Sequence, residues 1–168
     1  SENACEFGTV RGMNSSGILF EAYPGPPPGQ WSISDIASNE AANSLIGTGY
    51  WAPNLAGPGT HLPGIVVFGL DENGDFIFDK HFPRQDYSEE LGIDGSIGDA
   101  ICPIGTGEFV VASNRNLLWF DGDGNWTDSD LMVTDTTIKQ IELIGDTRLL
   151  LRTIENVYLV NFEGEVLQ

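Results

Sequence analysis

The C-terminal part of the sequence contains one pattern that is repeated without a gap. Residues 98–128 align with residues 138–168 at an offset of forty residues. Within this alignment the hydrophobic segment Phe109–Val111 matches Leu149–Leu151. Identical residues recur at the paired positions Ile101/Ile141, Ile104/Ile144, Gly105/Gly145, Asn116/Asn156 and Gly124/Gly164. A repeat of this period indicates successive, similar structural units, and it constrains the fold more than any other feature of the sequence.

Each copy of the repeat consists of short apolar segments separated by turns. In the second copy the segments are Ile141–Ile144, Leu149–Leu151, Val157–Val160 and Val166–Leu167. These segments are too short for helices and rich in residues that favour sheets, so we predict strands. The turns between them carry Gly, Asp and Asn, which favour tight turns. Four short antiparallel strands in forty residues match the size of one blade of a β-propeller.

A further copy is predicted upstream, where the strand Ile65–Leu70 is followed by the acidic turn Asp71–Asp75. Gly74 and Gly124 are fifty residues apart rather than forty, so we expect an inserted loop between these two copies. A weaker copy is expected at the N-terminus, ending near Trp31. The predicted blades are residues 1–32, 33–82, 96–134 and 137–168, with an insertion loop at residues 83–95.

The turn that precedes the outer strand has a recurring form. It reads D-x-x-G at Asp71–Gly74 and at Asp121–Gly124, and an aromatic residue, Phe76 or Trp126, opens the next strand. Over residues 30–168 this pattern resembles the blades of WD-like, quinoprotein-like and NHL-like β-propellers. The resemblance implies an all-β fold of about four four-stranded antiparallel blades, either as a small ring or as part of a larger one. A helical turn is expected only in Asp35–Asn43. Because the WD40 dipeptides and the quinoprotein tryptophan signatures are absent, the resemblance implies no functional residue.

The charge of the chain limits its partners. Seven basic residues against twenty-five acidic ones give a net charge of −18. Binding of nucleic acid through its phosphates is excluded because it requires a cationic surface, and an anionic membrane is disfavoured for the same reason. No segment approaches the roughly eighteen apolar residues that span a bilayer, so we expect no membrane insertion. The charge fits high solubility, a basic protein partner, divalent cations or a saline environment, and equally a solvated surface with no selected partner. Exposed strand edges in an open array would also permit a homo-oligomer or a larger assembly.

Cysteine content and glycan motifs bear on the location of the protein. Cys5 and Cys102 are the two cysteines, and a disulfide between them would stabilise the fold by roughly 4–5 kcal/mol. The alternative is that Cys102 is a buried strand residue and Cys5 a free thiol. Asn14 and Asn125 each begin an N-x-S/T sequence, which is a candidate glycosylation site. Together with the low lysine content, these features favour an extracytoplasmic location, either secreted or periplasmic.

Two groups of residues are candidate binding sites. The acidic turn that contains Asp121, Asp123, Asp128 and Asp130 offers ligands for a hard cation such as calcium. The spacing does not match an EF-hand, however, and a hairpin turn is the favoured interpretation. Tyr50 and Trp51 are adjacent and could form a stacking platform for a sugar or a proline-rich peptide. The favoured alternative for these two residues is packing within a blade.

No catalytic constellation is found, so we do not expect an enzyme. His61 and His81 lack ligand spacing, and no G-x-S-x-G motif is present. We expect a non-catalytic extracytoplasmic module for protein–protein interaction or structure, or a subunit of a larger assembly. Its contact surface is expected in the long loops at Tyr23–Gly29, Trp51–Pro63 and Pro83–Glu90. The alternatives are a carbohydrate-binding module, in one form calcium-assisted, and a glycosidase-like propeller enzyme with two carboxylates in a pocket.

Overall fold

The computed structural model describes residues 10–14, 17–22, 29–53, 64–83, 98–105, 107–130 and 133–168, and of residues 10–31 it describes only the backbone. Within these ranges the regular elements are β-strands and one short 3-10 helix, η1. The prediction of an all-β chain is therefore confirmed. The elements are β1 Val10–Asn14, β2 Gly17–Ala22, β3 Gly29–Asn39, η1 Glu40–Ala42, β4 Ser44–Pro53, β5 Gly64–Leu70, β6 Phe76–Pro83, β7 Ala100–Ile104, β8 Glu108–Ser113, β9 Asn116–Phe120, β10 Trp126–Asp130, β11 Gln140–Ile144, β12 Arg148–Arg152 and β13 Val157–Asn161.

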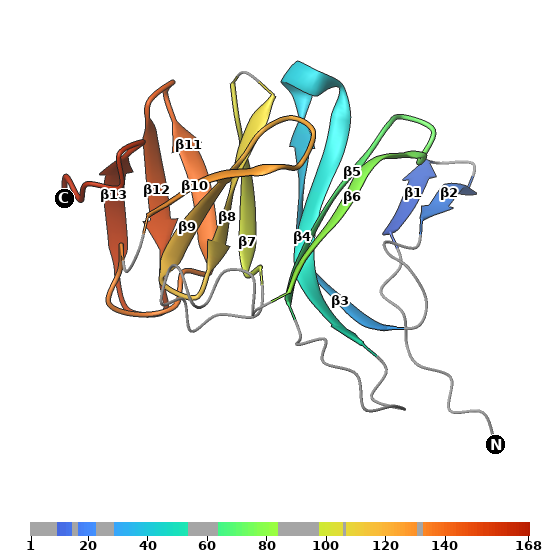
Figure 1. The fold of residues 1–168 in the computed structure, drawn as a ribbon. Coiled ribbons are helices and arrows are strands. Elements are labelled where there is room, and N and C mark those ends of the chain that lie inside the picture. The colour runs from blue at the N-terminus through green and yellow to red at the C-terminus, as the bar shows by residue number, and fades with distance from the viewer. Residues whose placement is uncertain are drawn as a thin grey trace.

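The described strands form antiparallel sheets in which neighbours in sequence are neighbours in space. We call them sheet A (β1-β2), sheet B (β3-β4-β5-β6), sheet C (β7-β8-β9-β10) and sheet D (β11-β12-β13). Sheets B, C and D stand side by side in chain order, and the β1-β2 hairpin lies beyond sheet B at the N-terminal end (Figure 1). Because sheet C packs face against face with sheet B on one side and sheet D on the other, the arrangement is propeller-like.

The forty-residue repeat corresponds to sheets C and D. Strands β7, β8 and β9 align at this offset with β11, β12 and β13, and each set pairs in the same order. The fourth segment of the last copy contributes less than was predicted. Val166 makes one isolated bridge with Val160, so sheet D has three strands in the part of the chain that the structure describes.

Two predicted boundaries change. Trp31 lies in β3, where it pairs with Trp51 of β4, and it therefore belongs to sheet B rather than to the preceding unit. The expected helical turn is confined to η1, while Asp35–Asn39 continue β3. Pro83 is the last residue of β6, and the rest of the predicted insertion loop, residues 84–95, lies outside the described residues.

Sheet C is buried on both faces. Successive residues of a strand point to opposite faces, so an apolar residue at every position serves two different interfaces. The face toward sheet B is formed by Ile101, Phe109, Val111, Leu118 and Phe120, which pack against Ile46, Ile65, Val67 and Phe78. The face toward sheet D is formed by Ala100, Cys102, Ile104, Val110, Ala112 and Leu117, which pack against Ile141, Leu149, Leu151 and Val160. This explains the nearly continuous apolar segments of the repeat.

Aromatic rings form the centre of the interface between sheets B and C. Phe109 stacks on Phe78 with ring centroids 5.7 Å apart and on Phe120 with centroids 5.1 Å apart. Phe82 approaches Phe120 at 5.5 Å with its ring tilted. Stacked pairs of this kind contribute about 0.5–1.5 kcal/mol beyond the burial of their area. Because β6 supplies Phe78 and Phe82, the outer strand of sheet B is held to sheet C.

We expect Phe109→Ala to lower the free energy of unfolding by about 3–5 kcal/mol, because it removes a fully buried ring and leaves a cavity. The measurement is chemical denaturation followed by tryptophan fluorescence. Phe76→Ala is the matched control, since Phe76 is 40% exposed and its loss should cost much less. Equal losses for the two variants would contradict the assignment of Phe109 to the core.

Candidate functional site

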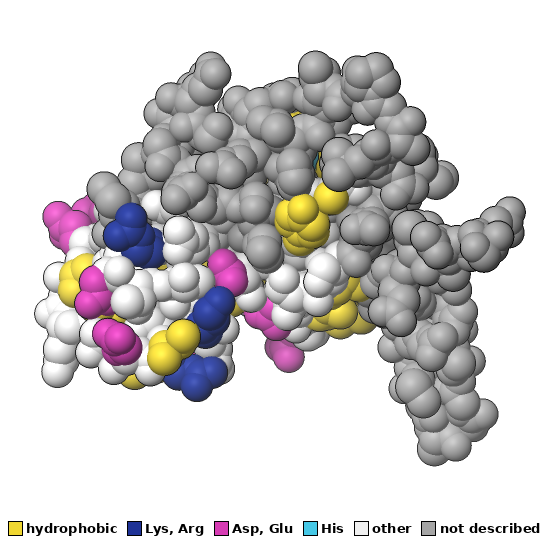
Figure 2. All heavy atoms as spheres, turned by 90° about the horizontal axis from the view of Figure 1, so that it is seen from below, with side chains coloured by type: hydrophobic (Ala, Val, Ile, Leu, Met, Phe, Trp, Pro, Cys, Tyr) yellow, Lys and Arg dark blue, Asp and Glu magenta, His cyan; other side chains and the backbone are white. Residues whose placement is uncertain are grey.

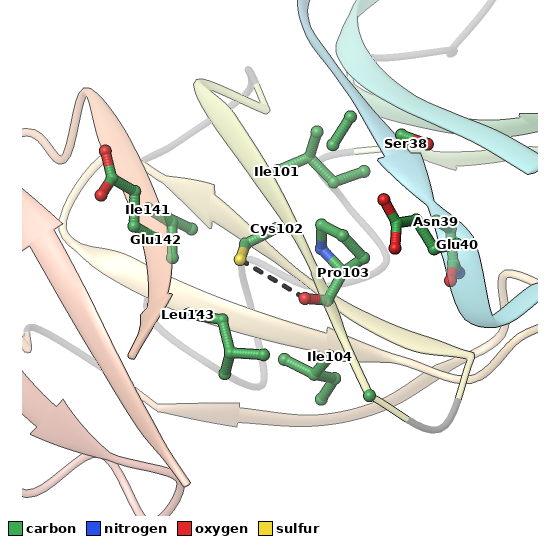
Figure 3. A pocket seen from close by; sticks show the side chains of 12 residues that line it. Ser38, Asn39, Glu40, Ile101, Cys102, Pro103, Ile104, Ile141, Glu142 and Leu143 are labelled. Carbon is green, nitrogen blue, oxygen red and sulfur yellow. Dashed lines mark hydrogen bonds between the residues drawn. The ribbon is translucent and has the colours of Figure 1, made fainter. Parts of the chain in front are cut away.

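An open cavity of about 560 Å³ lies where the first strands of sheets B, C and D approach one another. Its walls come from Ala37–Glu40 of β3 and η1, Ile101–Gly105 of β7 and its turn, and Ile141–Leu143 of β11 (Figure 3). We call it the first-strand pocket. Its volume lies within the range of about 300–1,000 Å³ that is usual for small-ligand sites.

The first strands form the pocket because they are the parts of the sheets that lie closest together. Strand β7 approaches β3 of sheet B on one side and β11 of sheet D on the other. Backbone groups of β7 are also tied to sheet B. The amide of Ile101 donates to Asp35 Oδ2 at 3.0 Å, and Gly98 donates to the Gly49 carbonyl at 3.0 Å. The pocket walls are therefore fixed by hydrogen bonds as well as by packing.

Asn39 positions the acidic side of the pocket. Its side chain is buried, donates through Nδ2 to the Gly107 carbonyl at 3.1 Å and accepts the Ala42 amide at the start of η1. These bonds hold Glu40 at the rim, where its carboxylate points toward Pro103 (Figure 3). Glu142 also lines the pocket, but its carboxylate points away from Cys102. The pocket thus combines apolar walls with one carboxylate directed across its opening.

Cys102 is a buried free thiol on the pocket wall. Its Sγ donates to the Pro103 carbonyl at 3.5 Å. Burial, with a smaller contribution from the nearby charges of Asp35 and Glu142, raises the pKa of Cys102 to about 11. A thiol with this pKa is protonated at neutral pH and is a poor nucleophile. Cys5 lies outside the described residues, so the predicted disulfide between these two cysteines stays a prediction.

The acidic turn that begins at Asp121 is organised by its own carboxylate. Asp121 Oδ1 accepts the backbone amides of Asp123 at 3.0 Å and of Asn125 at 2.8 Å. Its Oδ2 accepts the Asn125 side-chain amide at 2.9 Å. These bonds, that of the Asn125 side chain above all, lower the pKa of Asp121 below its ordinary value. Gly124 has φ of +74°, which the turn requires and which glycine adopts without strain.

The same turn occurs three times in the part of the chain that the structure describes. Asp71 accepts the amides of Asn73 and Asp75 at 2.8 and 2.9 Å, and these bonds likewise lower its pKa. Asn161 accepts the amides of Glu163 and Glu165 at 3.1 and 2.9 Å in the equivalent turn after β13. Since a neutral asparagine performs the role in the third copy, the side chain at this position serves the backbone and needs no charge. This supports the hairpin-turn interpretation.

The four candidate metal ligands do not converge. Asp130 accepts the indole Nε1–H of Trp119 at 2.7 Å, and burial raises its pKa. Asp128 accepts the Ser129 amide, and Asp121 is engaged within its turn, which also contains Asp123. Nowhere in the described ranges do three His, Cys, Asp or Glu side chains gather as a metal ion would require. A calcium site therefore stays a prediction that the geometry of these residues does not favour.

Tyr50 and Trp51 do not form one platform. They are consecutive in β4, so their side chains point to opposite faces of sheet B. Both are half-buried, and Trp51 stacks on His81 with ring centroids 5.3 Å apart. His81 Nε2 lies 3.3 Å from Asp79 Oδ1. The two residues are adjacent in sequence, and for that reason their rings lie on opposite faces of the sheet rather than on one stacking surface.

The remaining predicted sites fall partly outside the described residues. His61 lies outside them, as does most of the long loops at 23–29, 51–63 and 83–90. Asn14 ends β1, and only its backbone is described. Asn125 is exposed, and its Oδ1 accepts Lys80 Nζ at 3.2 Å. Glycosylation at Asn14 and Asn125 stays a prediction.

The first-strand pocket was missed by the sequence analysis because no motif marks it. Its walls come from three segments that are far apart in the sequence and share no motif. The repeat alignment contained one signal, since Ile101 and Ile141 are equivalent positions and both line the pocket.

Comparison with known proteins yields no family. No protein-family model matches the chain. No curated protein matches it either. Among solved structures, a protein of unknown function from Bacteroides caccae is similar with a TM-score of 0.47 and 12% identity, covering 95% of this chain and 68% of that one. The WD40 β-propeller domain of Doa1 is similar with a TM-score of 0.46 and 13% identity, covering 81% of this chain and 53% of that one. Both likenesses are too distant to carry a functional inference.

In the described part of the chain, no helix has the length and hydropathy needed to cross a membrane.

We expect Asp121→Asn to leave stability at pH 7 nearly unchanged, because asparagine fills the equivalent position in the turn at Asn161. Asp121→Ala should lower the free energy of unfolding by about 1 kcal/mol through the lost hydrogen bonds. Because the pKa of Asp121 is lower in the folded protein, its carboxylate stabilises the fold at pH values above its ordinary pKa of 3.8. This stabilisation is lost as the pH falls through the pKa of the folded state. Denaturation at pH 7 and pH 3 should therefore show a smaller acid loss for Asp121→Asn than for the parent. A larger acid loss in Asp121→Asn would overturn this account of the turn.

We expect Cys102 to resist alkylation in the folded protein, since its thiol is buried and protonated at neutral pH. The measurement is the rate of iodoacetamide labelling at pH 7.5 in a Cys5→Ser variant, folded and in denaturant, followed by mass spectrometry. Labelling at similar rates in the two states would show that the thiol is accessible.

Proposed function

We propose that the chain is a non-catalytic interaction module that binds a basic segment of a protein partner at the first-strand pocket. The observation that carries the proposal is the pocket itself, with apolar walls and the Glu40 carboxylate directed across its opening. A lysine or arginine side chain has both properties that such a site selects, an aliphatic stem and a cationic head. The stem would lie along Ile101, Pro103 and Leu143, and the head would lie near Glu40.

The surroundings of the pocket support a cationic ligand. The turns η1, β5-β6, β7-β8, β9-β10, β11-β12 and the turn after β13 lie at one end of the sheets, at the top of Figure 1, and we call this the turn end. No described residue within these turns is basic, while Arg148 directly follows the β11-β12 turn and Lys80 Nζ donates to Asn125 in the β9-β10 turn. Their acidic residues are Glu40, Asp71, Glu72, Asp75, Asp121, Asp123, Asp146, Glu163 and Glu165. Such a field attracts a basic partner and raises its association rate.

The opposite end of the sheets differs in charge. Arg115, Lys139 and Arg152 lie there, beside the ends of β8, β11 and β12. Figure 2 views the molecule from this side and shows Lys and Arg side chains interspersed with Asp and Glu side chains among the described residues. Lys139 Nζ forms an ion pair with Asp99 at 3.0 Å. Because this end mixes charges of both signs while the described charged residues within the turns of the turn end are all acidic, the turn end is the better candidate for a basic partner.

The alternative functions have less support. A carbohydrate platform at Tyr50 and Trp51 would need two rings on one face, and they lie on opposite faces. Glycoside hydrolysis needs two carboxylates that face each other across the scissile bond. The carboxylates of Glu40 and Glu142 line one pocket but do not face each other (Figure 3).

The proposal also covers the arrangement of the sheets as blades and the cellular location of the protein. Sheets B, C and D would be consecutive blades of a propeller-like array, either a small ring or part of a larger one, and the β1-β2 hairpin would belong to another blade. An extracytoplasmic location is supported by the low lysine content and the acidic surface.

The test is titration with a blocked lysine pentapeptide, followed by amide chemical shifts, with a blocked glutamate pentapeptide as the reference ligand. We expect shifts centred on residues 37–40 and 101–105, and no binding of the glutamate peptide. Glu40→Gln should weaken binding by about 3-fold or more, because one ion pair is lost. Gly105→Phe should abolish it, since a side chain at this position meets open space in the pocket and should not disturb the fold.

Glu163→Gln is the matched control, because it removes one carboxylate from the turn end at a distance from the pocket walls. Equal weakening by Glu40→Gln and Glu163→Gln would indicate diffuse attraction by the acidic turns and would overturn the assignment to the pocket.

A further inference from the structure

The side of sheet D that faces away from sheet C has an unusual composition. Residues Ile141, Leu149, Leu151 and Val160 point toward sheet C, so the alternate residues of the same strands point away from it. We call these the outer face. It consists of Gln140, Glu142, Ile144, Arg148, Leu150, Arg152, Val157, Leu159 and Asn161. Sheet D stands at the end of the row of sheets, and no described sheet covers this face (Figure 1).

The repeat shows what the equivalent face does in sheet C. At an offset of forty residues, the outer face of sheet D corresponds to the face of sheet C that sheet D covers. Four positions are apolar in both sheets, and they pair Ile104 with Ile144, Val110 with Leu150, Leu117 with Val157 and Trp119 with Leu159. Three positions change from small residues to polar or charged ones, and they pair Ala100 with Gln140, Cys102 with Glu142 and Ala112 with Arg152. The outer face thus keeps the apolar centre of a sheet-packing surface and adds charges of both signs.

Part of this apolar surface is in contact with solvent. Val157 is 58% exposed, and Ile154, in the turn just before it, is 81% exposed. Leu150 and Leu159 are half-buried, and Glu142, Arg148 and Arg152 are exposed. Exposed apolar surface with polar residues around it is typical of a protein interface.

Strand register fixes how the charges are arranged. Across the sheet the rows are Gln140–Arg152–Val157, Glu142–Leu150–Leu159 and Ile144–Arg148–Asn161. Leu150 is at the centre of this grid. Glu142 is beside it on β11, and the two arginines lie above and below it on β12.

We propose that a second copy of the chain binds at the outer face, related by a two-fold axis that passes by Leu150, with the two sheets crossed at a large angle. Two-fold interfaces place the same patch on both subunits, so the patch must complement itself. Face-to-face sheets pack either nearly aligned or nearly orthogonal. The distribution of charge distinguishes between these two arrangements.

Aligned packing brings like charges together. With the axis parallel to the strands, Arg148 and Arg152 each meet their own counterparts on the partner. With the axis perpendicular to the strands in the plane of the sheet, Glu142 meets the partner's Glu142 and Arg148 meets the partner's Arg152. Like charges in direct opposition are unfavourable.

Orthogonal packing brings opposite charges together. An axis that runs diagonally between the strand direction and the direction across the strands places the strands of one copy across those of the other. Along one diagonal Glu142 then meets the partner's Arg152, and along the other diagonal it meets the partner's Arg148. The first arrangement also places Ile144 on the partner's Val157, and both place Leu150 on the partner's Leu150. Symmetry forms the Glu–Arg pair twice. The outer face therefore complements a second copy of itself in a crossed arrangement.

The test is sedimentation equilibrium of the full chain up to millimolar concentration, because a three-stranded face is smaller than the standard interface of about 800 Å² per partner and should give a weak dimer. We expect the parent to form dimers. Leu150→Asp should abolish them, and Glu142→Arg and Arg148→Glu/Arg152→Glu should each weaken them by about 10-fold or more through like-charge pairs. Because all the charged positions are exposed, circular dichroism should show unchanged folding.

The decisive experiment mixes the two charge variants. The Glu142→Arg chain presents only positive charges on the outer face, and the Arg148→Glu/Arg152→Glu chain presents only negative ones. The mixture should form heterodimers, detected by native mass spectrometry, at a concentration where each variant alone is monomeric. A monomeric parent, dimers that the variants leave unchanged, or a mixture that stays monomeric would each overturn the proposal. Dimers through open strand edges would appear as the second of these outcomes.

Discussion

The fold depends on a central sheet in which three of the four strands, β7, β8 and β9, serve two interfaces. These strands have apolar residues at consecutive positions, and alternate residues pack against sheets B and D. A slip of one residue in any of the three would exchange the two sets of side chains between the two faces. The aromatic stack around Phe109 would then point toward sheet D, and the small residues Ala100 and Ala112 toward sheet B. Burial on both sides therefore specifies the register of sheet C more strictly than a sheet with one solvated face could.

The turns supply a second constraint on register. Asp71, Asp121 and Asn161 each accept two backbone amides in the turn that follows a third strand, which fixes where the strand ends. One of these turns also contacts the neighbouring sheet. A Cβ at Gly124 would clash with the ring of Phe78, so this glycine permits both the backbone conformation and the close packing of the turn on β6. Local turn chemistry and packing between sheets are thus coupled at one residue.

The sequence predicted correctly those parts of the structure that depend on residues close together in the chain. The repeat, the strands of sheets C and D and the acidic hairpin turns follow from periodicity and from turn residues that act within a few positions. The predictions failed where tertiary context decides. Asn116 and Asn156 are identical in the alignment, yet Asn116 is buried and donates to the Ser113 carbonyl while Asn156 is exposed. Trp31 was assigned to the wrong unit because its pairing with Trp51 is not visible in a single segment. The first-strand pocket escaped notice because it exists only where three sheets approach one another.

The chain enters sheet C through a contact that leaves no space for a side chain. Gly98 donates its amide to Gly49, and a Cβ on Gly98 would collide with Oγ1 of Thr48, which itself donates to the Val66 carbonyl at 2.9 Å. A substitution at position 98 is therefore compatible with the fold only if the residue at position 48 changes as well. A relative with alanine at position 98 should carry something smaller than threonine at position 48, and would then lose the hydrogen bond from Thr48 to the Val66 carbonyl.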